Sequence, residues 1–195
     1  MYSTPMDQPF SITCRKFWPD SQSFIHDSKK NGLNSTLRLL LTSGGTLTTS
    51  LQALMMGPVY LEVASQTIAE TDTETVQFLE LKKPEKVLYR EVWLLNDQKE
   101  RMVYARSYLP MNSIDPFLLQ QLQLKSRSIG DLIDFSNLPS LKDKMTFSRV
   151  ESAPLAREFN LVKESLMWCR HYRLKVQNHL LASIQEVFSP SLFET

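Results

Sequence analysis

The sequence is poor in cysteine, in net charge and in long apolar runs, and each scarcity excludes a class of protein. The two cysteines, at positions 14 and 169, form neither a disulfide framework nor a CxxC motif. The formal net charge is only +1, and the basic residues are dispersed, so the basic face that binds nucleic acid is missing. No apolar run approaches the roughly 20 residues of a membrane span. The first residues lack a basic segment followed by an apolar one, so we expect no signal peptide and a reducing, cytoplasmic location.

The length of 195 residues suits one domain with an appendage. Residues 1–32 are polar and contain several prolines, and we expect them to form an irregular N-terminal arm. Four apolar residues of this arm are expected to pack onto the body: Phe17, Trp18, Phe24 and Ile25. Residues 33–195 should form the body. Nothing in the sequence suggests an extensive apolar exterior, so we expect a monomer.

Apolar periodicity predicts a body that mixes helices and strands. Helices are expected over 36–41, after a cap at Asn34 or Ser35, over 47–55 after Thr46, over 113–124, and near Gly130. Alternating residues predict strands over 59–68, 75–81, 86–95, 101–109, 144–152, 166–176 and 179–188. The short gaps after residues 95 and 176 predict two hairpins. We therefore predict an α+β fold with a single antiparallel sheet of about six strands and helices packed on one face.

Two predicted strands carry a charge on their apolar side. With a period of two, Arg90 shares its side with Leu88 and Val92, and Glu186 shares its side with Ile184 and other apolar residues. A buried charge needs a partner or a ligand. The two residues therefore form a structural Arg90–Glu186 ion pair or extend to the edge of the sheet. Alternatively, they are the polar groups of an apolar cavity that holds a small anionic ligand.

Other candidate sites have less support. Cys169 and His171 share one side of a strand, but no orienting acid is evident for nucleophilic catalysis. The three histidines lack metal-binding spacing, so no metal is expected. The segment TSGGT, residues 42–46, is a turn between helices or a source of backbone N–H groups for an anion. Arg170 is expected at the rim of the sheet.

Five segments together resemble the chorismate pyruvate-lyase family, over roughly residues 36–193. They are LLLTSGGTLTTSLQ, YREVWLLNDQKERMVYARSYLP, LKSRSIGDLI, WCRHYRL and IQEVFSPSLF, in this order. No single segment is specific, but their order is. The resemblance is to the cyanobacterial and algal-plastid branch, which adds the plastid stroma as a location if the protein is plastid-encoded. It implies that residues 33–195 are a chorismate-lyase-like domain with a buried site.

The resemblance also implies a reaction and its residues. The family converts chorismate to 4-hydroxybenzoate and pyruvate without a metal or an organic cofactor, and so supplies quinone head-group synthesis. By position, Arg90 would bind the ring carboxylate and Glu186 would face the ring hydroxyl. Leu47 stands where the family usually has Met, and Ile129 where it has Leu; both would contact the substrate. For the second carboxylate of chorismate, Arg149 is the first candidate and Arg106 the second.

Two further functions remain open at this point. The first is a binder of a small aromatic carboxylate without catalysis, because effector domains of some bacterial transcription factors resemble chorismate lyase in fold. Such regulators carry a helix-turn-helix of roughly 60–70 residues before the effector domain, whereas about 32 residues precede the body here. The second is a lyase acting on a related cyclohexadiene.

Overall fold

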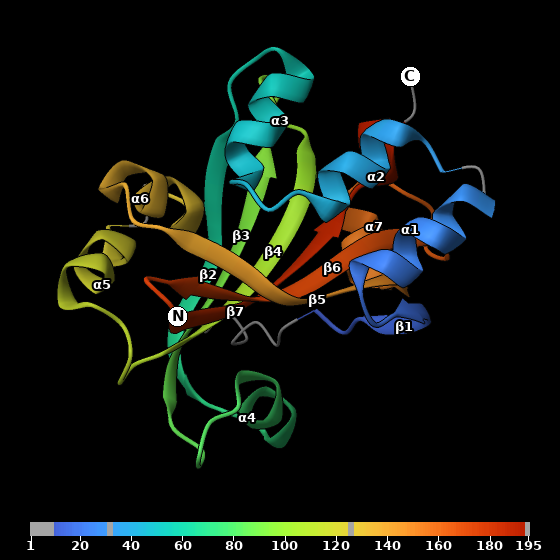
Figure 1. The fold of residues 1–195 in the computed structure, drawn as a ribbon. Coiled ribbons are helices and arrows are strands. Elements are labelled where there is room, and N and C mark those ends of the chain that lie inside the picture. The colour runs from blue at the N-terminus through green and yellow to red at the C-terminus, as the bar shows by residue number, and fades with distance from the viewer. Residues whose placement is uncertain (1–9, 31–32, 125–126, 194–195) are drawn as a thin grey trace, which may run out of the picture.

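The computed structural model describes residues 10–30, 33–124 and 127–193, and in this part of the chain it contains one antiparallel sheet (Figure 1). The strand order is β1-β5-β6-β7-β4-β3-β2. The strands are β1 (Thr13–Trp18), β2 (Tyr60–Glu70), β3 (Lys86–Leu95), β4 (Arg101–Pro110), β5 (Ser140–Glu151), β6 (Met167–Val176) and β7 (His179–Phe188). The predicted α+β fold with a single antiparallel sheet is confirmed, with seven strands in the described residues where we expected about six.

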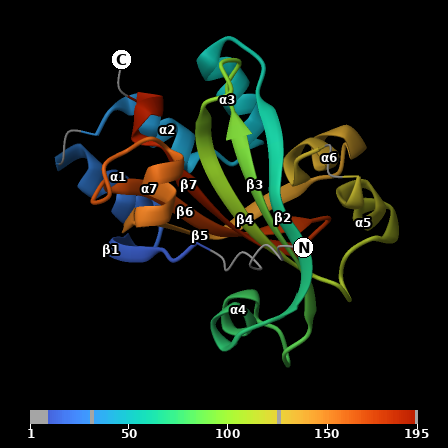
Figure 2. The same ribbon diagram turned by 180° about the vertical axis from the view of Figure 1, so that it is seen from behind.

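Helices lie on both faces of the sheet, where we expected them on one face. They are α1 (Ser21–Lys30), α2 (Ser35–Thr42), α3 (Leu47–Met55), α4 (Thr73–Leu79), α5 (Pro116–Gln123), α6 (Ile129–Ser136) and α7 (Ala153–Glu158), followed by a 3-10 turn (Pro190–Phe193). One face packs against α1, α2 and α3 in one cluster and against α5 and α6 in another. The opposite face packs against α7, which lies in front of the sheet when the molecule is seen from behind (Figure 2). In the described residues, no helix has the length and apolar character needed to cross a bilayer.

Both predicted hairpins are present. Strands β3 and β4 pair from Val87 with Pro110 to Leu95 with Arg101. Strands β6 and β7 are joined by Gln177 and Asn178, whose φ angles are 49° and 66°. Two consecutive residues with positive φ match the twist of a two-residue hairpin, and Asn tolerates this conformation better than most residues.

The predicted strand over residues 75–81 is wrong, because this segment contains helix α4. The Asp72 side chain accepts a hydrogen bond from the backbone N–H of Thr75 at 2.7 Å, which caps the helix. Glu74 in the first turn is favourable near the positive end of the helix dipole. Thr75 and Leu79 are the buried residues of this helix, and their spacing is helical.

The N-terminal segment is more regular than expected. Residues 13–18 form the edge strand β1, which pairs with β5, and residues 21–30 form α1. Trp18 and Phe24 are buried, as predicted, whereas Phe17 and Ile25 are exposed. The expected irregular structure is therefore wrong for residues 13–18 and 21–30, while residues 1–9 and 31–32 lie outside the described part. The division into an arm and a body stays a prediction.

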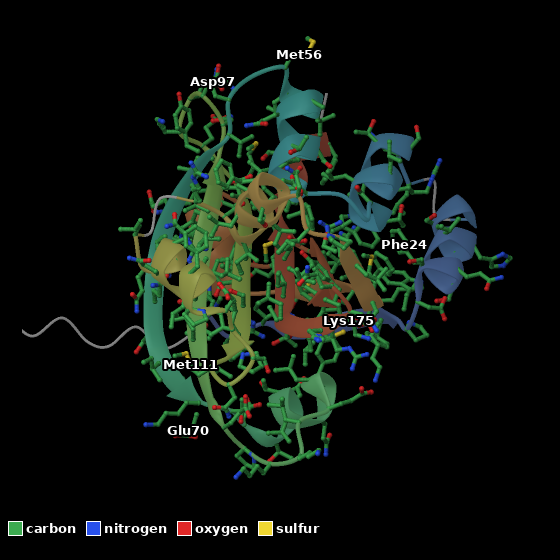
Figure 3. The ribbon with its side chains drawn as sticks, turned by 60° about the vertical axis from the view of Figure 1, so that its left-hand side comes forward. Phe24, Met56, Glu70, Asp97, Met111 and Lys175 are labelled. Atoms are coloured by element: carbon green, nitrogen blue, oxygen red, sulfur yellow. The ribbon has the colours of Figure 1, made fainter. Side chains whose placement is uncertain are left out.

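We expect Phe24→Ala to destabilise the whole domain. Phe24 is fully buried between α1 and the sheet (Figure 3), and its ring stacks on Phe147 of β5 with centroids 4.5 Å apart. Truncating such a ring costs about 3–5 kcal/mol of the free energy of unfolding, which urea denaturation measures. The matched control is Phe17→Ala, because Phe17 is 57% exposed. Equal midpoints for the two variants would mean that α1 is a separable arm.

Candidate functional site

A cavity of about 130 Å³ lies on one face of the sheet, between the α2–α3 pair and the α5–α6 pair. Strands β3, β4, β6 and β7 form its floor and β5 part of its wall. Its polar and small lining residues are Gly44, Gly45, Thr46, Thr48, Arg90, Ala105, Ser107, Ser128, Gly130, Asp134, Ser140, Lys142, Tyr172 and Glu186. Its apolar lining residues are Leu47, Val92, Leu94, Ile129, Ile133, Leu174 and Ile184. More of the cavity surface is apolar than polar, and few of its lining groups are charged, as is usual in small-molecule sites.

Arg90 lines this cavity as a buried cation that pairs with no carboxylate of the described residues. Its side chain comes from β3 and is 1% exposed. One terminal nitrogen, Nη2, donates to the backbone carbonyl of Arg127 at 2.9 Å, but Nε has no hydrogen-bond partner. Burial lowers the pKa of Arg90 to about 10, so the side chain stays charged at neutral pH. No described carboxylate lies within 4.0 Å of the guanidinium, so this charge is open to compensation by an anionic ligand in the cavity.

Glu186 lines the same cavity but pairs with Arg170. Its carboxylate accepts hydrogen bonds from Arg170 Nε and from the Tyr172 hydroxyl, the latter at 3.1 Å. The predicted Arg90–Glu186 ion pair is wrong, and the sheet order explains why. Glu186 on β7 lies directly across from Arg170 on β6, whereas β4 separates β7 from β3.

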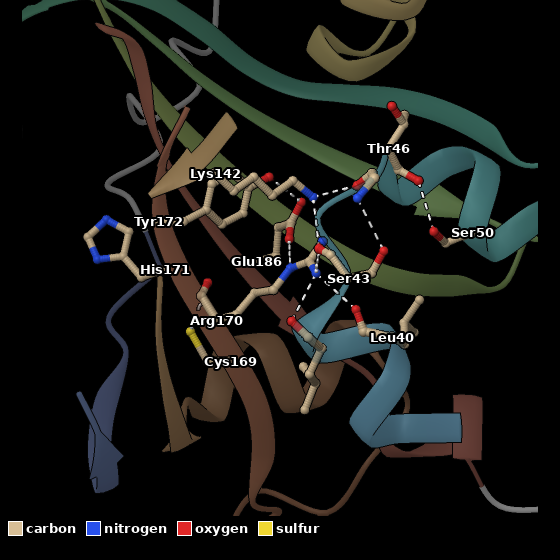
Figure 4. A network of polar contacts seen from close by, with 12 residues as sticks. Leu40, Ser43, Thr46, Ser50, Lys142, Cys169, Arg170, His171, Tyr172 and Glu186 are labelled. Atoms are coloured by element: carbon tan, nitrogen blue, oxygen red, sulfur yellow. Dashed lines mark hydrogen bonds and ion pairs between the residues drawn. The ribbon is translucent and has the colours of Figure 1, made fainter. Parts of the chain in front are cut away.

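Arg170 is fully buried in the interior of the sheet, so the expectation of a rim position is wrong. Its Nη1 donates to the carbonyls of Leu40, Leu41 and Ser43 at 2.9, 3.0 and 3.3 Å, at the end of α2 (Figure 4). Carbonyls at the C-terminal end of a helix favour a cation. Burial is the largest single influence and would lower the pKa of Arg170, but Glu186, Tyr172 and Cys169 together outweigh it, so that pKa is raised. Arg170 therefore fixes the position of the Glu186 carboxylate in the cavity wall.

Lys142 is a charged lining residue that sequence reasoning missed. Its Nζ donates to the carbonyl of Gly45 at 2.6 Å and lies 4.9 Å from the centre of the Tyr172 ring (Figure 4). Burial, and to a lesser degree Arg170, lowers the pKa of Lys142 to about 8. The strand predicted over 144–152 in fact begins at Ser140, so Lys142 was placed in a loop. An earlier strand start would still have placed Lys142 on the opposite face from Phe147 by simple alternation. The irregularity of β5 between Asp143 and Thr146 is what brings both residues to the same face.

Leu47 and Ile129, the two further predicted substrate contacts, are brought together at the cavity. Each is the first residue of its helix, α3 and α6, and each is 7% exposed. Ser128 caps α6 by accepting from the N–H of Asp131 at 3.0 Å, and Asp131 in return accepts from Ser128. Both helix N-termini therefore meet at the cavity, and both favour negative charge there.

Arg149 and Arg106 are not brought to the cavity. Arg149 of β5 lies over the Trp168 ring, 4.5 Å from its centre, and donates to the carbonyl of Leu166 at 3.2 Å. Arg106 of β4 is paired in register with Glu91, and alternation places both on the opposite face of the sheet from Arg90. Lys142, rather than either arginine, is the further cation in the cavity wall.

The chain matches the family described as "Chorismate pyruvate-lyase Rv2949c-like" over residues 41–195. The chain belongs to this chorismate pyruvate-lyase family. The predicted family resemblance is thereby confirmed, and the match includes every residue that lines the cavity.

A curated relative of this family member is "Uncharacterized protein ycf21" of Cyanophora paradoxa. It is 27% identical over 165 residues, which cover 82% of each chain.

Among solved structures, the chain is similar in fold to ligand-binding parts of transcriptional regulators. The effector domain of PhnF from Mycobacterium smegmatis gives a TM-score of 0.62 at 14% identity, covering 75% of this chain and 90% of that one. The ligand-binding domain of a putative GntR-family regulator from Bordetella bronchiseptica gives 0.56 at 13% identity, covering 67% and 85%. At these identities the likeness concerns the fold alone.

The thiol and imidazole of Cys169 and His171 do not form a catalytic pair in this chorismate-lyase-like fold. Both lie on the face opposite the cavity, since they alternate with Arg170. Burial raises the pKa of Cys169 to about 12 and lowers that of His171 to about 4. His171 instead contacts the Ser183 hydroxyl at 2.7 Å and stacks on Phe78 of α4. A buried neutral thiol is a poor nucleophile.

We expect Gly130→Ala to destabilise the wall of the cavity. A Cβ at this position of α6 would lie 2.6 Å from Cγ2 of Thr46, just before α3. Alanine favours a helix over glycine by about 1 kcal/mol, but this overlap costs more, and we expect a net loss of about 1–2 kcal/mol in the free energy of unfolding.

The control for Gly130→Ala removes the methyl group that it would meet. Thr46 makes no side-chain capping hydrogen bond, so Thr46→Ser alone should change little. Thr46→Ser combined with Gly130→Ala should restore the stability in urea denaturation. A double variant no more stable than Gly130→Ala would mean that the contact between the two helix N-termini is not the cause.

Proposed function

We propose that the protein is a chorismate pyruvate-lyase, which converts chorismate to 4-hydroxybenzoate and pyruvate. The observation that carries this proposal is Arg90, a buried cation that lines an apolar cavity and has a free Nε. Membership of the chorismate pyruvate-lyase family supplies the substrate class. A planar guanidinium binds a carboxylate through two parallel hydrogen bonds.

The cavity offers an environment for each part of the substrate ring. Arg90 on β3 would bind the ring carboxylate, and the apolar side chains of Val92 and Ile184 would contact the ring. Glu186 would accept a hydrogen bond from the ring hydroxyl. Its position is fixed by Arg170, so it needs no reorganisation when substrate binds.

The reaction is an elimination that makes the ring aromatic. The bond between the ring carbon and the ether oxygen breaks, and its electron pair stays on the departing enolpyruvate. The neighbouring ring carbon, which bears the hydroxyl, loses its hydrogen as a proton, and that electron pair forms the new ring double bond. Enolpyruvate gains a proton on its methylene carbon and becomes pyruvate. Because aromaticity supplies the driving force, the protein has to fix a reactive conformer and stabilise the developing charge.

A direct assay tests the proposal. Purified protein is mixed with chorismate in the presence of a metal chelator and without any cofactor, and both products are followed by chromatography. We expect 4-hydroxybenzoate and pyruvate in equal amounts, above the level in a heat-denatured sample that accounts for spontaneous decay. Absence of both products would overturn the proposed reaction.

A second candidate function is binding of a small aromatic carboxylate without turnover. The observation that favours it is the fold likeness to effector and ligand-binding domains of transcriptional regulators. Calorimetry with 4-hydroxybenzoate separates the two functions: binding in a protein that makes no product identifies a binder. Product formation at many turnovers per protein molecule excludes it as the whole function.

A further inference from the structure

The enclosed lining of the cavity includes Glu186, which is paired with Arg170, and two cations, Arg90 and Lys142. Arg170 and Glu186 neutralise one another. Within the described residues, neither Arg90 nor Lys142 has a carboxylate oxygen within 4.0 Å. Asp134, the other acidic lining residue, is exposed to solvent. The enclosed part of the cavity therefore has a formal charge of about two positive units in excess, which matches a ligand with two carboxylates.

We infer that Lys142 binds the second carboxylate of a dianionic substrate, the one on its enolpyruvyl group. This inference rests on the proposed function, because it assigns the second anionic group of the same ligand. Arg90 and Lys142 come from β3 and β5, which β4, β7 and β6 separate in the sheet. The two cations therefore approach the cavity from different sides, as two separate carboxylates on one ring require.

The contacts of Lys142 leave its ammonium group available. Nζ donates to the Gly45 carbonyl at 2.6 Å, and its contact with the Ser43 carbonyl is long, at 3.5 Å. An ammonium group has three donors, so one can remain on Gly45 while another meets a carboxylate. A hydrogen bond between two charged groups is stronger than one to a neutral carbonyl.

Arg170 lies nearby, and its Nη2 has no hydrogen-bond partner among the described residues, but its charge is already offset by Glu186. Its Nε is bound to Glu186, and its Nη1 is bound to three backbone carbonyls at the end of α2. Moving it would leave the buried Glu186 carboxylate unpaired, which is costly. Lys142, on a flexible stem, gives up no ion pair when it binds a ligand.

Lys142 also contributes to the reaction itself. When the ether bond breaks, negative charge grows on the enolpyruvate group that carries the bound carboxylate. A neighbouring ammonium stabilises this charge more than it stabilises the substrate. The charged groups that face Lys142 are Arg170 on β6, Glu186 on β7 and Asp134 on α6, with the Tyr172 ring beside it. The effects of these charges on the pKa of Lys142 partly cancel, and burial remains the main cause of its low value of about 8. We therefore expect kcat/KM to fall as the pH rises through about 8, where Lys142 of the free protein loses its proton.

The test compares a dianionic and a monoanionic probe by calorimetry. The dianion is 3-(carboxymethoxy)-4-hydroxybenzoate, which keeps the ring carboxylate and places a second carboxylate on an ether. The monoanion is 4-hydroxybenzoate. Lys142→Met removes the charge and keeps the length of the side chain. Lys144→Met is the matched control on the same strand, because Lys144 is exposed and pairs with Glu80 outside the cavity.

We expect Lys142→Met to weaken binding of the dianion about tenfold to a hundredfold, as loss of one charge-assisted hydrogen bond does. Binding of 4-hydroxybenzoate should change less than about twofold, and Lys144→Met should affect neither probe. An equal loss for both probes would assign Lys142 a structural role and overturn the inference, as would no loss for either. If the wild-type protein binds both probes but makes no product from chorismate, the proposed reaction fails and the inference stands on the binding data.

The pH profile of activity gives an independent readout. In wild-type protein the alkaline fall of kcat/KM should lie near pH 8, and Lys142→Arg should move it above pH 9 while keeping part of the activity. An alkaline limb that stays in place in Lys142→Arg would overturn the assignment of that limb to Lys142.

Discussion

Replacing Arg90 with Met is expected to abolish almost all turnover while leaving the protein at least as stable. Without the guanidinium, the ring carboxylate would enter an apolar cavity unpaired, which costs about 3–5 kcal/mol. This corresponds to a loss of roughly two to four orders of magnitude in kcat/KM for chorismate. The stability should respond in the opposite direction, because the ligand-free protein no longer buries a cation without a carboxylate partner.

Steady-state kinetics and urea denaturation of the same samples measure both effects. The control is Arg15→Met on β1, where the arginine is exposed and pairs with Glu151 at the surface. Loss of an exposed pair changes stability by less than about 1 kcal/mol and should leave kcat/KM unchanged. Arg90→Lys should recover only part of the activity, since an ammonium cannot make the two parallel hydrogen bonds of a guanidinium. A near-normal kcat/KM in Arg90→Met would remove Arg90 from the substrate site.

The second large effect is expected from Arg170→Met, and it is an effect on stability. The variant leaves the Glu186 carboxylate buried without its partner, which costs about 3–5 kcal/mol of the free energy of unfolding. Glu186 will then tend to take up a proton, and its pKa in the folded variant will rise above the unfolded value. A group with a raised folded pKa contributes its stability below the unfolded pKa and loses it as the pH rises. The defect should therefore be larger at pH 8 than at pH 5.

A double variant separates the ion pair from simple loss of packing. Arg170→Met with Glu186→Gln has no buried charge left unpaired, so it should regain most of the lost stability and lose the extra pH dependence. Urea midpoints at both pH values measure this coupling. If the double variant is as unstable as Arg170→Met at both pH values, the guanidinium acts through its contacts with α2 and not through Glu186.

The hairpins of this fold could be predicted because their signals are local. Strands β3, β4, β6 and β7 are each runs of ten residues rich in strand-forming side chains, and Gln177-Asn178 is a two-residue turn between the last two. The strand β1 could not be predicted in this way, since Trp18 is its one buried residue and five exposed residues show no alternation. Helix α7 has six residues, too few to show a helical period.

The part of the candidate site that depends on side-chain alternation within one strand could be predicted. The period of two identified Arg90 and Glu186 as charges on buried faces, and both line the cavity. Their partners depend on the order of strands in the sheet, which is a property of the whole fold. The sequence therefore did not reveal that Glu186 would form its ion pair with Arg170 and not with Arg90. Lys142 was missed for a related reason, because a bulge interrupts the alternation of β5.

The position of β7 in the sheet has a consequence for how the chain is made. Of the seven strands in the described residues it comes last along the chain, yet it lies in the middle of the sheet, between β4 and β6. Until β7 is synthesised, β2-β3-β4 and β1-β5-β6 are two separate parts of the sheet, each with an open edge. The pairing of β1 with β5 also joins distant residues, because Arg15 binds Glu151, 136 positions later. Open edges pair readily with other chains, and distant strands pair slowly. The nascent protein is thus most prone to aggregate just before its final strand leaves the ribosome, and that strand both protects it and completes its cavity.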